Sequence, residues 1–502
     1  MPEDIIKELA SRLSSTGILV AADINQENLK LIDTELLVSK IISRRSGASG
    51  LSIVNNDEIL NIIREMELEK TPMPVEVMHR SGFKPLAAEI DANYGIKYRE
   101  VERAEGTVDD FVSYFRGRLE ELRKIIESHR GNISGLVSSL ASVKSYADGR
   151  EVTIIGIITR RTLTKNGNMM AIVEDETAEA KVIFMNGSSQ QTRTLFEQAN
   201  SLINDEIVAV KGKISGPFII ANDVIWPDVP VKIKKPSEDD VAIAFISDMH
   251  IGSKLFMDKN FSLFINWLNG SVDTRSDLAG KIKYIVVGGD VVDGIGVYPN
   301  QDKDLAVLDV YTQYSIFFNL IKAVPEYIHV FIIPGNHDAV QRAEPQPQLG
   351  SDMIGDFKAE NVHILPNPSF LTLHGIDVLT YHGTSLDSII SAIPNTSYAY
   401  PERAMAEILK RRHLSPIYGG NIIVPSKHDS MVIDRVPDIL HMGHVHKNGI
   451  ANYHGVDIVN SGTWQARTDY QVLQGHIPTP CILPVFDAKR NEFISIDFNR
   501  GV

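Results

Sequence analysis

The sequence predicts a multidomain α+β protein with a small helical N-terminal domain, an OB-like β-barrel and a large mixed domain, in that order. Its 502 residues exceed one ordinary hydrophobic core, so about two to four domains are expected. Apolar residues recur at helical spacing near the N-terminus, short strand patterns dominate the middle, and strand and helix patterns alternate after residue 240. We expect a helical domain over residues 1–65, a linker over 66–105, a helix plus barrel over 106–235 and the large domain over 240–502.

The composition limits which classes of protein the chain can belong to. Hydrophobic residues make up 43% of the chain and charged residues 23%, as in soluble globular proteins. The one cysteine, Cys481, excludes an intramolecular disulfide and fits a reducing compartment, so we expect a cytoplasmic protein. We find no signal peptide, and no apolar run reaches the roughly 18 residues of a membrane span. The net charge of −14 argues against binding nucleic acid by bulk attraction alone, so a partner would supply much of any grip on DNA.

The first 105 residues carry no chemical motif. Apolar residues at helical spacing predict a first helix, and the segments 34–43 and 57–66 resemble two further amphipathic helices. The first helix is marked by Ile5, Ile6, Leu9 and Leu13. A folding or partner-binding module is the expected role. Pro72, Pro74 and Pro85, with scattered charge, indicate a linker over 66–105.

A helix is predicted from Thr107 to about Ser128. Thr107 and Asp110 have the spacing of a capping box, in which each side chain bonds the other residue's backbone N–H. Apolar residues follow on one helical face: Phe111, Phe115, Leu119, Leu122 and Ile126. We expect this stripe to pack on a neighbouring element and not on a cofactor.

The segment 150–230 is predicted to be all-β. Five strand patterns, with a helix before the fourth, match an oligonucleotide/oligosaccharide-binding barrel. The patterns cover 151–158, 169–175, 179–184, 206–212 and 218–225. Arg160, Arg161 and Lys165 suit DNA binding, but the strands carry few of the aromatic residues that bind single strands in such barrels. A structural or interface role is therefore favoured, with direct DNA binding as the alternative.

Five segments of the large domain share one design, an apolar strand pattern that ends on side chains able to bind metal. These side chains are Asp248, His250, Asp290, Asn336, His337, Asp338, His382, His444 and His446. Only two of the 15 histidines precede residue 241. The alternative is chance clustering of packed or surface histidines. Strand ends that bring nitrogen and oxygen ligands to one sheet edge indicate a two-metal site.

The order of these residues resembles the signature of calcineurin-like metallophosphoesterases. It reads Asp248-x-His250, Gly289-Asp290, Gly335-Asn-His-Asp338, His382-Gly383 and Gly443-His-Val-His446. The resemblance implies an αββα sandwich and two divalent cations bridged by Asp290. One cation would take Asp248, His250, Asp290 and His446, and the other Asp290, Asn336, His382 and His444. His337 would protonate the leaving oxygen or stabilise the transition state, with Asp338 orienting His337.

Imidazole mixed with carboxylate suits Mn²⁺, Fe or Zn²⁺ better than Mg²⁺ or Ca²⁺, and Mn²⁺ is our first choice. We expect Gly288, Gly289, Gly335 and Gly443 to allow tight turns beside the metals. His441 is expected to be packed and not a ligand. An insert over 384–436 should overhang the site, and its basic run, residues 410–413, is either a solvated face or a contact for substrate phosphate.

A narrower resemblance surrounds these motifs. The stretches Ile333-Pro-Gly-Asn-His-Asp-Ala-Val-Gln-Arg-Ala-Glu-Pro-Gln-Pro347, His441-Met-Gly-His-Val-His-Lys-Asn-Gly449 and Asn460-Ser-Gly-Thr-Trp-Gln465 are similar to the small subunit of the archaeal D-family DNA polymerase. That family implies a proofreading 3′→5′ exonuclease, active with Mn²⁺ on DNA, in a heterodimer with a large polymerase subunit. Sliding-clamp binding stays open.

Two alternatives remain. The first is a stand-alone metallophosphoesterase or repair nuclease, against which the barrel and the N-terminal helices count. The second is a non-catalytic scaffold of a polymerase, against which the complete ligand set counts.

Overall fold

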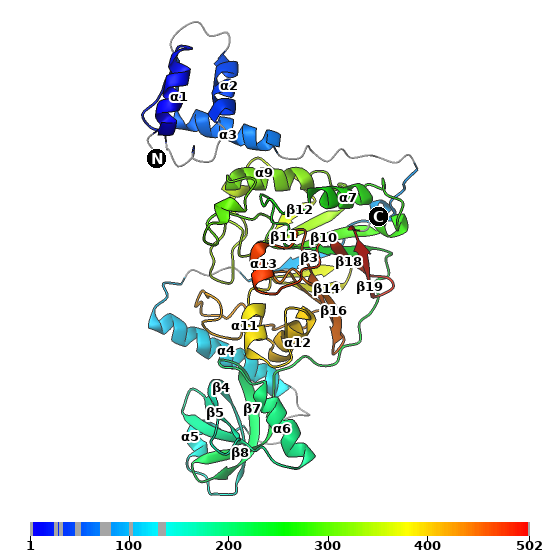
Figure 1. Cartoon of the computed structure of the whole chain (residues 1–502). Coiled ribbons are helices and arrows are strands. Elements are labelled where there is room, and N and C mark those ends of the chain that lie inside the picture. The colour runs from blue at the N-terminus through cyan, green and yellow to red at the C-terminus, as the bar shows by residue number, and fades with distance from the viewer. Residues whose placement is uncertain are drawn as a thin grey trace.

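The N-terminal unit contains the three expected helices and a small sheet that the sequence did not predict. The computed structural model describes residues 4–24, 29, 34–45, 52–70, 82–99, 104–128 and 137–499 (Figure 1). The helices are α1 (Asp4–Ser14), α2 (Thr34–Arg45) and α3 (Asn56–Lys70). Strands β1 (Ile18–Val20) and β2 (Ser52–Val54) pair in parallel. Three-residue strands are too short for an alternating pattern, which explains why they gave no signal.

The expected linker is partly ordered structure. Helix α3 extends to Lys70, while Pro72 and Pro74 lie outside the described residues. A short helix, η2 (Leu86–Glu89), is followed by strand β3 (Tyr94–Lys97), which pairs antiparallel with β13 (Ser369–Leu373). Residues 82–99 therefore belong to the body of the large domain. All four β3 residues are exposed, and the alternation of Tyr94 and Ile96 with Gly95 and Lys97 is too short to predict this edge strand.

Helix α4 (Val108–Ser128) matches the predicted helix and its cap. The Thr107 backbone N–H donates to the Asp110 carboxylate at 2.9 Å, and the Asp110 N–H donates to the Thr107 hydroxyl at 3.2 Å. Buried Leu119, Leu122 and Ile126 pack against barrel residues and Val432 of the large domain. The apolar face of α4 thus joins the two domains, and Figure 1 shows the helix between them.

The predicted five-stranded barrel is confirmed. Its strands are β4 (Glu151–Leu163), β5 (Met169–Glu174), β6 (Glu179–Phe184), β7 (Ile207–Ser215) and β8 (Phe218–Ile225). They close in the order β4-β5-β6-β8-β7. Helix α5 (Leu140–Val143) precedes them, and α6 (Gln190–Asn200) precedes the fourth strand, as expected.

The large domain contains two six-stranded sheets. The first has the order β12-β11-β10-β9-β18-β19 and the second β16-β17-β15-β14-β13-β3. The first is built from β9 (Ala242–Ile246), β10 (Ile282–Gly288), β11 (His329–Ile333), β12 (Val362–Ile364), β18 (Ile482–Asp487) and β19 (Glu492–Asp497). The second adds β14 (Ile376–Thr380), β15 (Ile439–Met442), β16 (Asn448–Tyr453) and β17 (Val456–Ser461).

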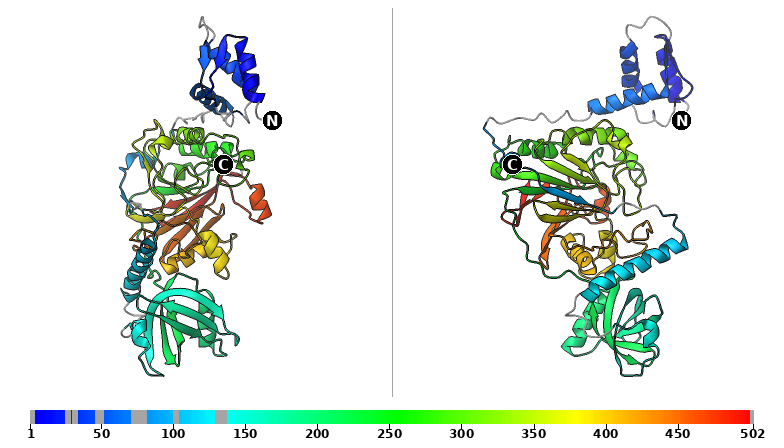
Figure 2. Two further views of the ribbon diagram at one scale, coloured as in Figure 1. Left: turned by 90° about the vertical axis from the view of Figure 1, so that its left-hand side faces the viewer. Right: turned by 180° about the vertical axis from the view of Figure 1, so that it is seen from behind.

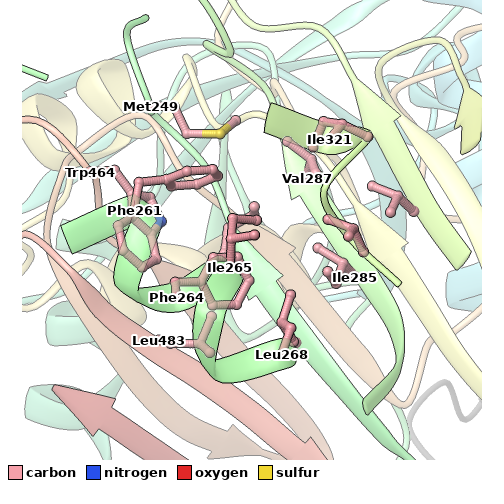
Figure 3. Packing of buried hydrophobic residues seen from close by; sticks show 14 of the residues in the cluster. Met249, Phe261, Phe264, Ile265, Leu268, Ile285, Val287, Ile321, Trp464 and Leu483 are labelled. Carbon is pink, nitrogen blue, oxygen red and sulfur yellow. The ribbon is translucent and has the colours of Figure 1, made fainter. Parts of the chain in front are cut away.

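Alternation along β9 shows how these layers are filled. Ala244 and Ile246 face a core that includes Phe261 and Phe264 of α7 (Asp258–Leu268), with Trp464 beside them (Figure 3). Ile243 and Phe245, on the opposite face, pack in a cluster with residues of the second sheet such as Val378, Ile439 and Val459. Because successive side chains of a strand point to opposite faces, the first sheet lies between helices and the second sheet. This burial on both faces explains the continuous apolar runs in the sequence.

Helices complete the outer layers. The first sheet's core includes residues of α8 (Ser276–Ala279) and α9 (Val310–Ile321), and α10 (Ser351–Ile354) packs against it. The second sheet packs with α11 (Leu386–Ala392) and α12 (Pro401–Arg411). Two short elements, η3 (Gln301–Lys303) and α13 (Asp469–Leu473), lie in loops. None of the helices in the described ranges has the length and apolarity that a bilayer crossing requires.

The basic run at residues 410–413 has a different role from either one expected. Arg411 Nε lies 2.7 Å from the Glu206 carboxylate of the barrel, and the His413 ring lies 2.7 Å from Asp429. Arg412 donates to the Ile433 carbonyl at 2.6 Å. These three side chains are buried, so they form neither a solvated face nor a phosphate contact. They join the barrel, helix α12 and the insert.

Candidate active site

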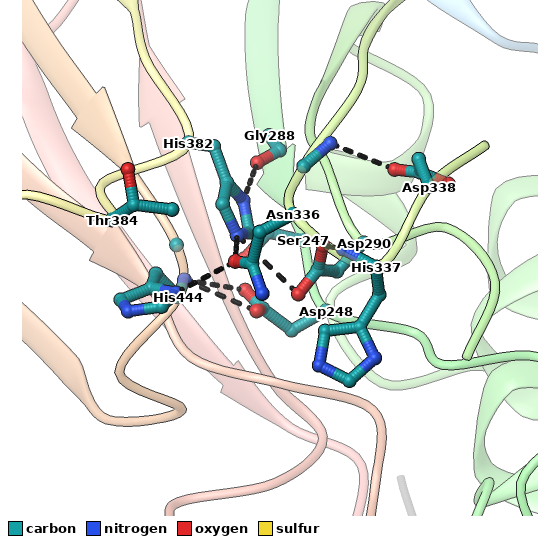
Figure 4. Close-up of polar contacts among 12 residues, drawn as sticks. Ser247, Asp248, Gly288, Asp290, Asn336, His337, Asp338, His382, Thr384 and His444 are labelled. Carbon is teal, nitrogen blue, oxygen red and sulfur yellow. Dashed lines mark hydrogen bonds and ion pairs between the residues drawn. The ribbon is translucent and has the colours of Figure 1, made fainter. Parts of the chain in front are cut away.

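Parallel strands place the predicted ligands at one edge of the two sheets. Asp248 and His250 follow β9, Asp290 follows β10, and Asn336 and His337 follow β11, three neighbouring parallel strands. His382 follows β14, while His444 and His446 follow β15, which pairs in parallel with β14. Since parallel strands end at the same edge, residues up to 198 positions apart meet there (Figure 4).

The carboxylates and imidazoles form overlapping groups that could hold a metal ion. Ligand atoms of Asp248, His250 and His446 lie within 4.8 Å of one another, as do those of Asp248, Asp290 and His382. All five residues are buried. The Nε2 atoms of His250 and His446 face each other at 3.0 Å. Two imidazole nitrogens at this distance, with carboxylates beside them, need a cation or a proton between them.

Asp290 lies between the two groups. Its Oδ2 is 3.7 Å from His250 Nε2 and 3.3 Å from His382 Nε2. On the far side, the Asn336 side-chain oxygen is 2.9 Å from His382 Nε2 and 3.0 Å from His444 Nδ1. Figure 4 shows Asn336 between these two rings. The structure therefore brings together all seven residues that the sequence predicted as ligands.

The electrostatics of this cluster favour positive charge. Burial opposes protonation of His250 and His382, but the negative charges around the two rings favour it more strongly, so both pKa values are raised. The Asp293 hydrogen bond and the Asp290 charge raise the His250 pKa to about 9, and Asp290 raises the His382 pKa to about 10. A site that stabilises extra protons so strongly also stabilises a divalent cation in their place.

The backbone of the cluster is strained. Five of the seven candidate ligands have positive φ: Asp248 (53°), His250 (49°), Asp290 (50°), His444 (70°) and His446 (57°). Such conformations cost about 1–3 kcal/mol each for residues other than glycine and concentrate at functional sites. At Gly335, a Cβ atom would overlap the Asp290 carboxylate and come within 2.6 Å of the Asp290 nitrogen. Gly335 is therefore required by the close approach of Asp290, whereas the positive φ expected of a tight turn occurs at Gly289 (93°) among the four glycines singled out.

His337 is placed at the mouth of the cluster. Its Nδ1 lies 2.8 Å from the Asp293 carbonyl oxygen, which fixes Nδ1 as the protonated nitrogen, and Nε2 has no hydrogen-bond partner among the described residues. Its ring lies edge-on to the His250 ring, with 4.6 Å between centroids. The pKa of His337 is lowered because the effect of burial outweighs that of the Asp290 charge, which raises it. The side chain is 16% exposed, so a substrate can reach it.

Asp338 does not have the expected contact with the His337 ring. Its carboxylate accepts from the Gly335 N–H at 2.8 Å and the Tyr314 hydroxyl at 3.0 Å, and its nearest further donor is the Val291 N–H at 3.3 Å. Asp338 therefore ties the loops after β10 and β11 together. The orienting contact comes from Asp293, because its carbonyl holds the His337 ring.

Three polar residues beside the ligands were not predicted. The Asp293 carboxylate is 2.8 Å from His250 Nδ1, Gln471 Nε2 is 2.8 Å from His446 Nδ1, and Asp387 is 3.0 Å from His444 Nε2. Each contact holds the outward nitrogen of an imidazole, as outer partners of metal-binding histidines do. Asp293 could have been found from its position three residues after Asp290. Asp387 and Gln471 lie on the short helices α11 and α13, and no sequence pattern indicated that these helices border the site.

The expected overhang of the insert is present on one side of the site. Asp387 of α11 reaches His444, and Asn421 donates to the Glu344 carboxylate at 2.7 Å. Glu344 is buried and also accepts from the Tyr381 hydroxyl at 3.0 Å and from Thr384. The insert thereby braces the loop that carries His382. His441 is buried, with Nε2 2.9 Å from the Ser461 hydroxyl, in agreement with a packed role.

The fold and the site together define a multidomain protein in which a closed barrel is joined to an α+β domain with a buried candidate metal centre. Comparison with known proteins gives the class. The model of a family described as the B subunit of DNA polymerase alpha/epsilon matches residues 243–449, which hold every residue of the cluster.

Archaeal relatives give the particular family. The DNA polymerase II small subunit of Methanocaldococcus jannaschii is 38% identical over 434 residues, covering 84% of this chain and 72% of the relative. That of Archaeoglobus fulgidus is 40% identical over 393 residues, covering 76% of each chain. That of Methanothermobacter thermautotrophicus is 33% identical over 488 residues, covering 96% of this chain and 98% of the relative. The chain therefore belongs to the family of archaeal DNA polymerase II small subunits, the D-family small subunits that its motifs indicated.

Proposed function

We propose that this chain is a metal-dependent 3′→5′ exodeoxyribonuclease that removes nucleotides from DNA 3′ ends beside a large polymerase subunit. The observation that carries the proposal is the buried cluster at the sheet edge, in which two groups of ligand atoms share Asp248. The relatives' name, which describes a small subunit of a DNA polymerase, supports DNA as substrate and a large subunit as partner.

The architecture supports a calcineurin-like phosphoesterase. Two sheets pack face to face, helices cover their outer faces, and the ligands follow strand after strand in the order of that superfamily. In that assignment Asp248, His250, Asp290 and His446 hold one cation. Asp290, Asn336, His382 and His444 hold the second. The position of Asp290 Oδ2 between His250 and His382 supports its bridging role.

The donor set fits Mn²⁺. It combines imidazoles with carboxylates and one amide, which suits Mn²⁺, Fe or Zn²⁺, whereas Mg²⁺ and Ca²⁺ prefer oxygen ligands. Bound divalent ions would neutralise the scissile phosphate and lower the pKa of water at neutral pH. Asp293 and Asp387 hold the outward nitrogens of His250 and His444, so these rings are oriented before any ion binds.

His337 serves the leaving group. Hydrolysis adds a water oxygen to phosphorus and breaks the bond from phosphorus to the 3′ oxygen, which leaves as a hydroxyl once it gains a proton. Nδ1 of His337 donates to the Asp293 carbonyl, so Nε2 is the atom that faces the leaving oxygen. Nε2 carries this proton when the ring is in its imidazolium form, which the nearby Asp290 charge favours and burial opposes. Its place at the mouth, with the ring partly exposed, suits contact with a substrate oxygen rather than with an ion.

The test uses purified protein and a 5′-labelled primer annealed to a longer template, with Mn²⁺ present. Wild type should shorten the primer stepwise from its 3′ end. Asp248→Asn should abolish shortening by removing a charge from both groups of ligand atoms, and Asp302→Asn, an exposed acid on η3, is the matched control. If no primer is shortened even with the large subunit added, the chain is a non-catalytic scaffold and the nuclease proposal is wrong.

A further inference from the structure

One segment borders the metal cluster but is not used in the proposed reaction. Residues 466–479, called here the rim segment, contain the short helix α13, which has a capping box at Thr468. Gln471 of this helix contacts the His446 ring at 2.8 Å, and the Thr479 N–H donates to the His446 carbonyl at 2.9 Å. Figure 1 and the left panel of Figure 2 show α13 projecting from the same side of the domain as α11, which carries Asp387. The rim segment therefore lies against the site.

The outer surface of the rim segment is apolar. Four large side chains within eight residues are exposed: Tyr470 (66%), Val472 (52%), Leu473 (84%) and Ile477 (68%). Exposed apolar side chains gathered in one place mark binding surfaces more often than they mark ordinary protein surface. Tyr470, Val472 and Leu473 lie on the helix whose Gln471 contacts His446, and Ile477 follows that helix, so this surface borders the site.

Aromatic rings connect this surface to the opposite side of the cluster. The His476 ring of the rim segment lies on the Tyr398 ring of the insert, with 4.0 Å between centroids and 33° between planes. The Tyr398 hydroxyl donates to Asp387 at 2.9 Å, and Asp387 contacts His444 at 3.0 Å. Burial and the Asp387 charge raise the pKa of Tyr398.

A cation accompanies the rings. Arg467 is exposed and has no ion pair or hydrogen bond to another described side chain. Burial lowers the pKa of His476. The Asp387 charge opposes this effect and the Arg467 charge adds to it, so both an acid and a cation lie near the stacked pair. Aromatic rings beside an unpaired cation are the combination that binds single-stranded nucleic acid, with bases stacked on the rings and a phosphate near the cation.

We propose that the rim segment, with Tyr398, binds the unpaired 3′-terminal nucleotides of DNA and presents the terminal phosphodiester to the cluster. The proposal rests on the proposed nuclease function and adds to it the surface that would hold the terminal bases. A paired terminal base is already stacked in its duplex and cannot stack on Tyr470 or on the Tyr398–His476 pair, so unpaired and paired ends are compared in the test.

DNA is favoured over a protein as the occupant of this surface. A protein bound across residues 466–479 would close the side of the site that Gln471 borders and hinder a phosphate from reaching the cluster. The unpaired Arg467 also suits a phosphate more than an apolar partner. An interface with the large subunit is nevertheless a distinct outcome of the experiment below.

The experiment measures binding without hydrolysis. Full-length protein in EDTA is titrated into oligodeoxythymidylate carrying the fluorescent base 2-aminopurine at its 3′ end, at its 5′ end, or at the 3′ end of a blunt duplex. Stacking on the rim should change the fluorescence of the single-stranded 3′ base and leave the other two signals nearly unchanged. Equal changes for all three positions would overturn the proposal.

Variants assign the effect to the rim. Tyr470→Ala should weaken binding of the single strand about fivefold or more, as loss of one stacked base does, and Tyr470→Phe should not. Arg467→Ala should weaken it and reduce its salt dependence. The matched control is Ile233→Ala, which removes an exposed apolar side chain in the connector before the large domain.

The outcomes separate this proposal from the nuclease. Loss of binding in Tyr470→Ala supports the rim as a DNA site even if wild type shortens no primer, in which case only the nuclease fails. Unchanged DNA binding in Tyr470→Ala and Arg467→Ala overturns the rim proposal whatever the nuclease result. If the same variants instead lose affinity for the large subunit, the surface is a protein interface and the proposal is wrong.

Discussion

Asp293 contacts two histidines of the cluster through different groups. Its carboxylate lies 2.8 Å from Nδ1 of His250, and its backbone carbonyl lies 2.8 Å from Nδ1 of His337. Gln301 donates to both the carboxylate and the carbonyl of Asp293 and so fixes the residue itself. One buried residue thus orients a candidate metal ligand and the candidate proton donor.

Asp293→Asn should weaken metal binding while leaving the fold intact. The amide is the same size as the carboxylate but lacks its charge, so it orients and polarises the His250 ring less. Loss of such an outer partner typically reduces metal affinity about 10–100-fold. Calorimetric titration with Mn²⁺ measures this change. Asp304→Asn, at an exposed acid that bonds Tyr298, is the control and should match wild type. Equal Mn²⁺ affinity in Asp293→Asn and wild type would contradict the assigned role.

His337→Ala should separate catalysis from metal binding. In the proposed assignment His337 is not a ligand, although its ring also forms a group of candidate ligand atoms with His250 and Asp293, so this variant tests that assignment. Loss of a positioned proton donor should lower primer shortening about 10²–10⁴-fold. Mn²⁺ affinity, measured by the same titration, should stay within about twofold of wild type. A variant that loses both together would show that His337 binds metal, and undiminished shortening would show that another residue supplies the proton.

Gly335→Ala should damage the site by steric overlap. The added Cβ would meet the Asp290 carboxylate and backbone, neither of which can move without displacing the turn after β10. Overpacking of this kind costs about 1–3 kcal/mol, and here it should also abolish Mn²⁺ binding. Gly95→Ala is the control, since its Cβ would have its nearest neighbour at 3.8 Å. Chemical denaturation and metal titration check the two effects, and normal metal binding in Gly335→Ala would contradict the geometry.

The buried ion pair at the junction of α4 with the insert should be sensitive to loss of one partner. Asp429 accepts from Arg118 Nε at 2.7 Å and lies 2.7 Å from His413, all in buried positions. Asp429→Asn leaves the Arg118 charge uncompensated and should cost about 3–5 kcal/mol in the free energy of unfolding. Asp434→Asn, which breaks an exposed pair with Arg99, should cost less than about 1 kcal/mol. Equal losses in urea denaturation would show that burial does not set the cost.

The cluster was predictable because it follows from strand order. Each ligand comes directly after an apolar run, and parallel strands deliver their ends to one edge, so Asp248 and Asp290 had to meet once both runs were strands. The barrel was predictable from five short patterns with turns between them. The capping box at Thr107 was predictable because it depends on only two residues, Thr107 and Asp110, which lie three positions apart.

The remaining features depend on contacts that no local pattern reveals. Strand β3 is an exposed edge, so nothing in its composition distinguishes it from a linker. Arg411 looks like part of a solvated run until the fold brings Glu206, 205 positions earlier, to within 2.7 Å. Asp338 follows His337 directly, yet its carboxylate bonds Gly335 and Tyr314 because the turn directs the two side chains apart. Sequence spacing identified residue types but not the partners of buried charges.

The histidine pair beside β3 should make stability depend on pH. His329 Nδ1 lies 3.2 Å from His363 Nε2, the two rings are stacked at 7°, and the Tyr94 ring of β3 packs on both. Burial, with His363 and Lys283 nearby, lowers the His329 pKa to about 4, and burial lowers the pKa of His363. In the unfolded chain both histidines would have a pKa of about 6.5.

Between about pH 6.5 and 4 this histidine pair therefore binds more protons in the unfolded chain than in the folded one, and its contribution to stability falls as the pH falls through this window. His329→Phe keeps a ring against Tyr94 but removes one titrating group, so its free energy of unfolding should fall less steeply across this window than that of wild type. Urea denaturation at several pH values measures both slopes. The control is His428→Phe, at an exposed position, which should keep the wild-type slope. If the free energy of unfolding of His329→Phe changes with pH as that of wild type does, protonation of His329 and His363 does not disturb their packing. The contact of β3 with these histidines would then be independent of their charge.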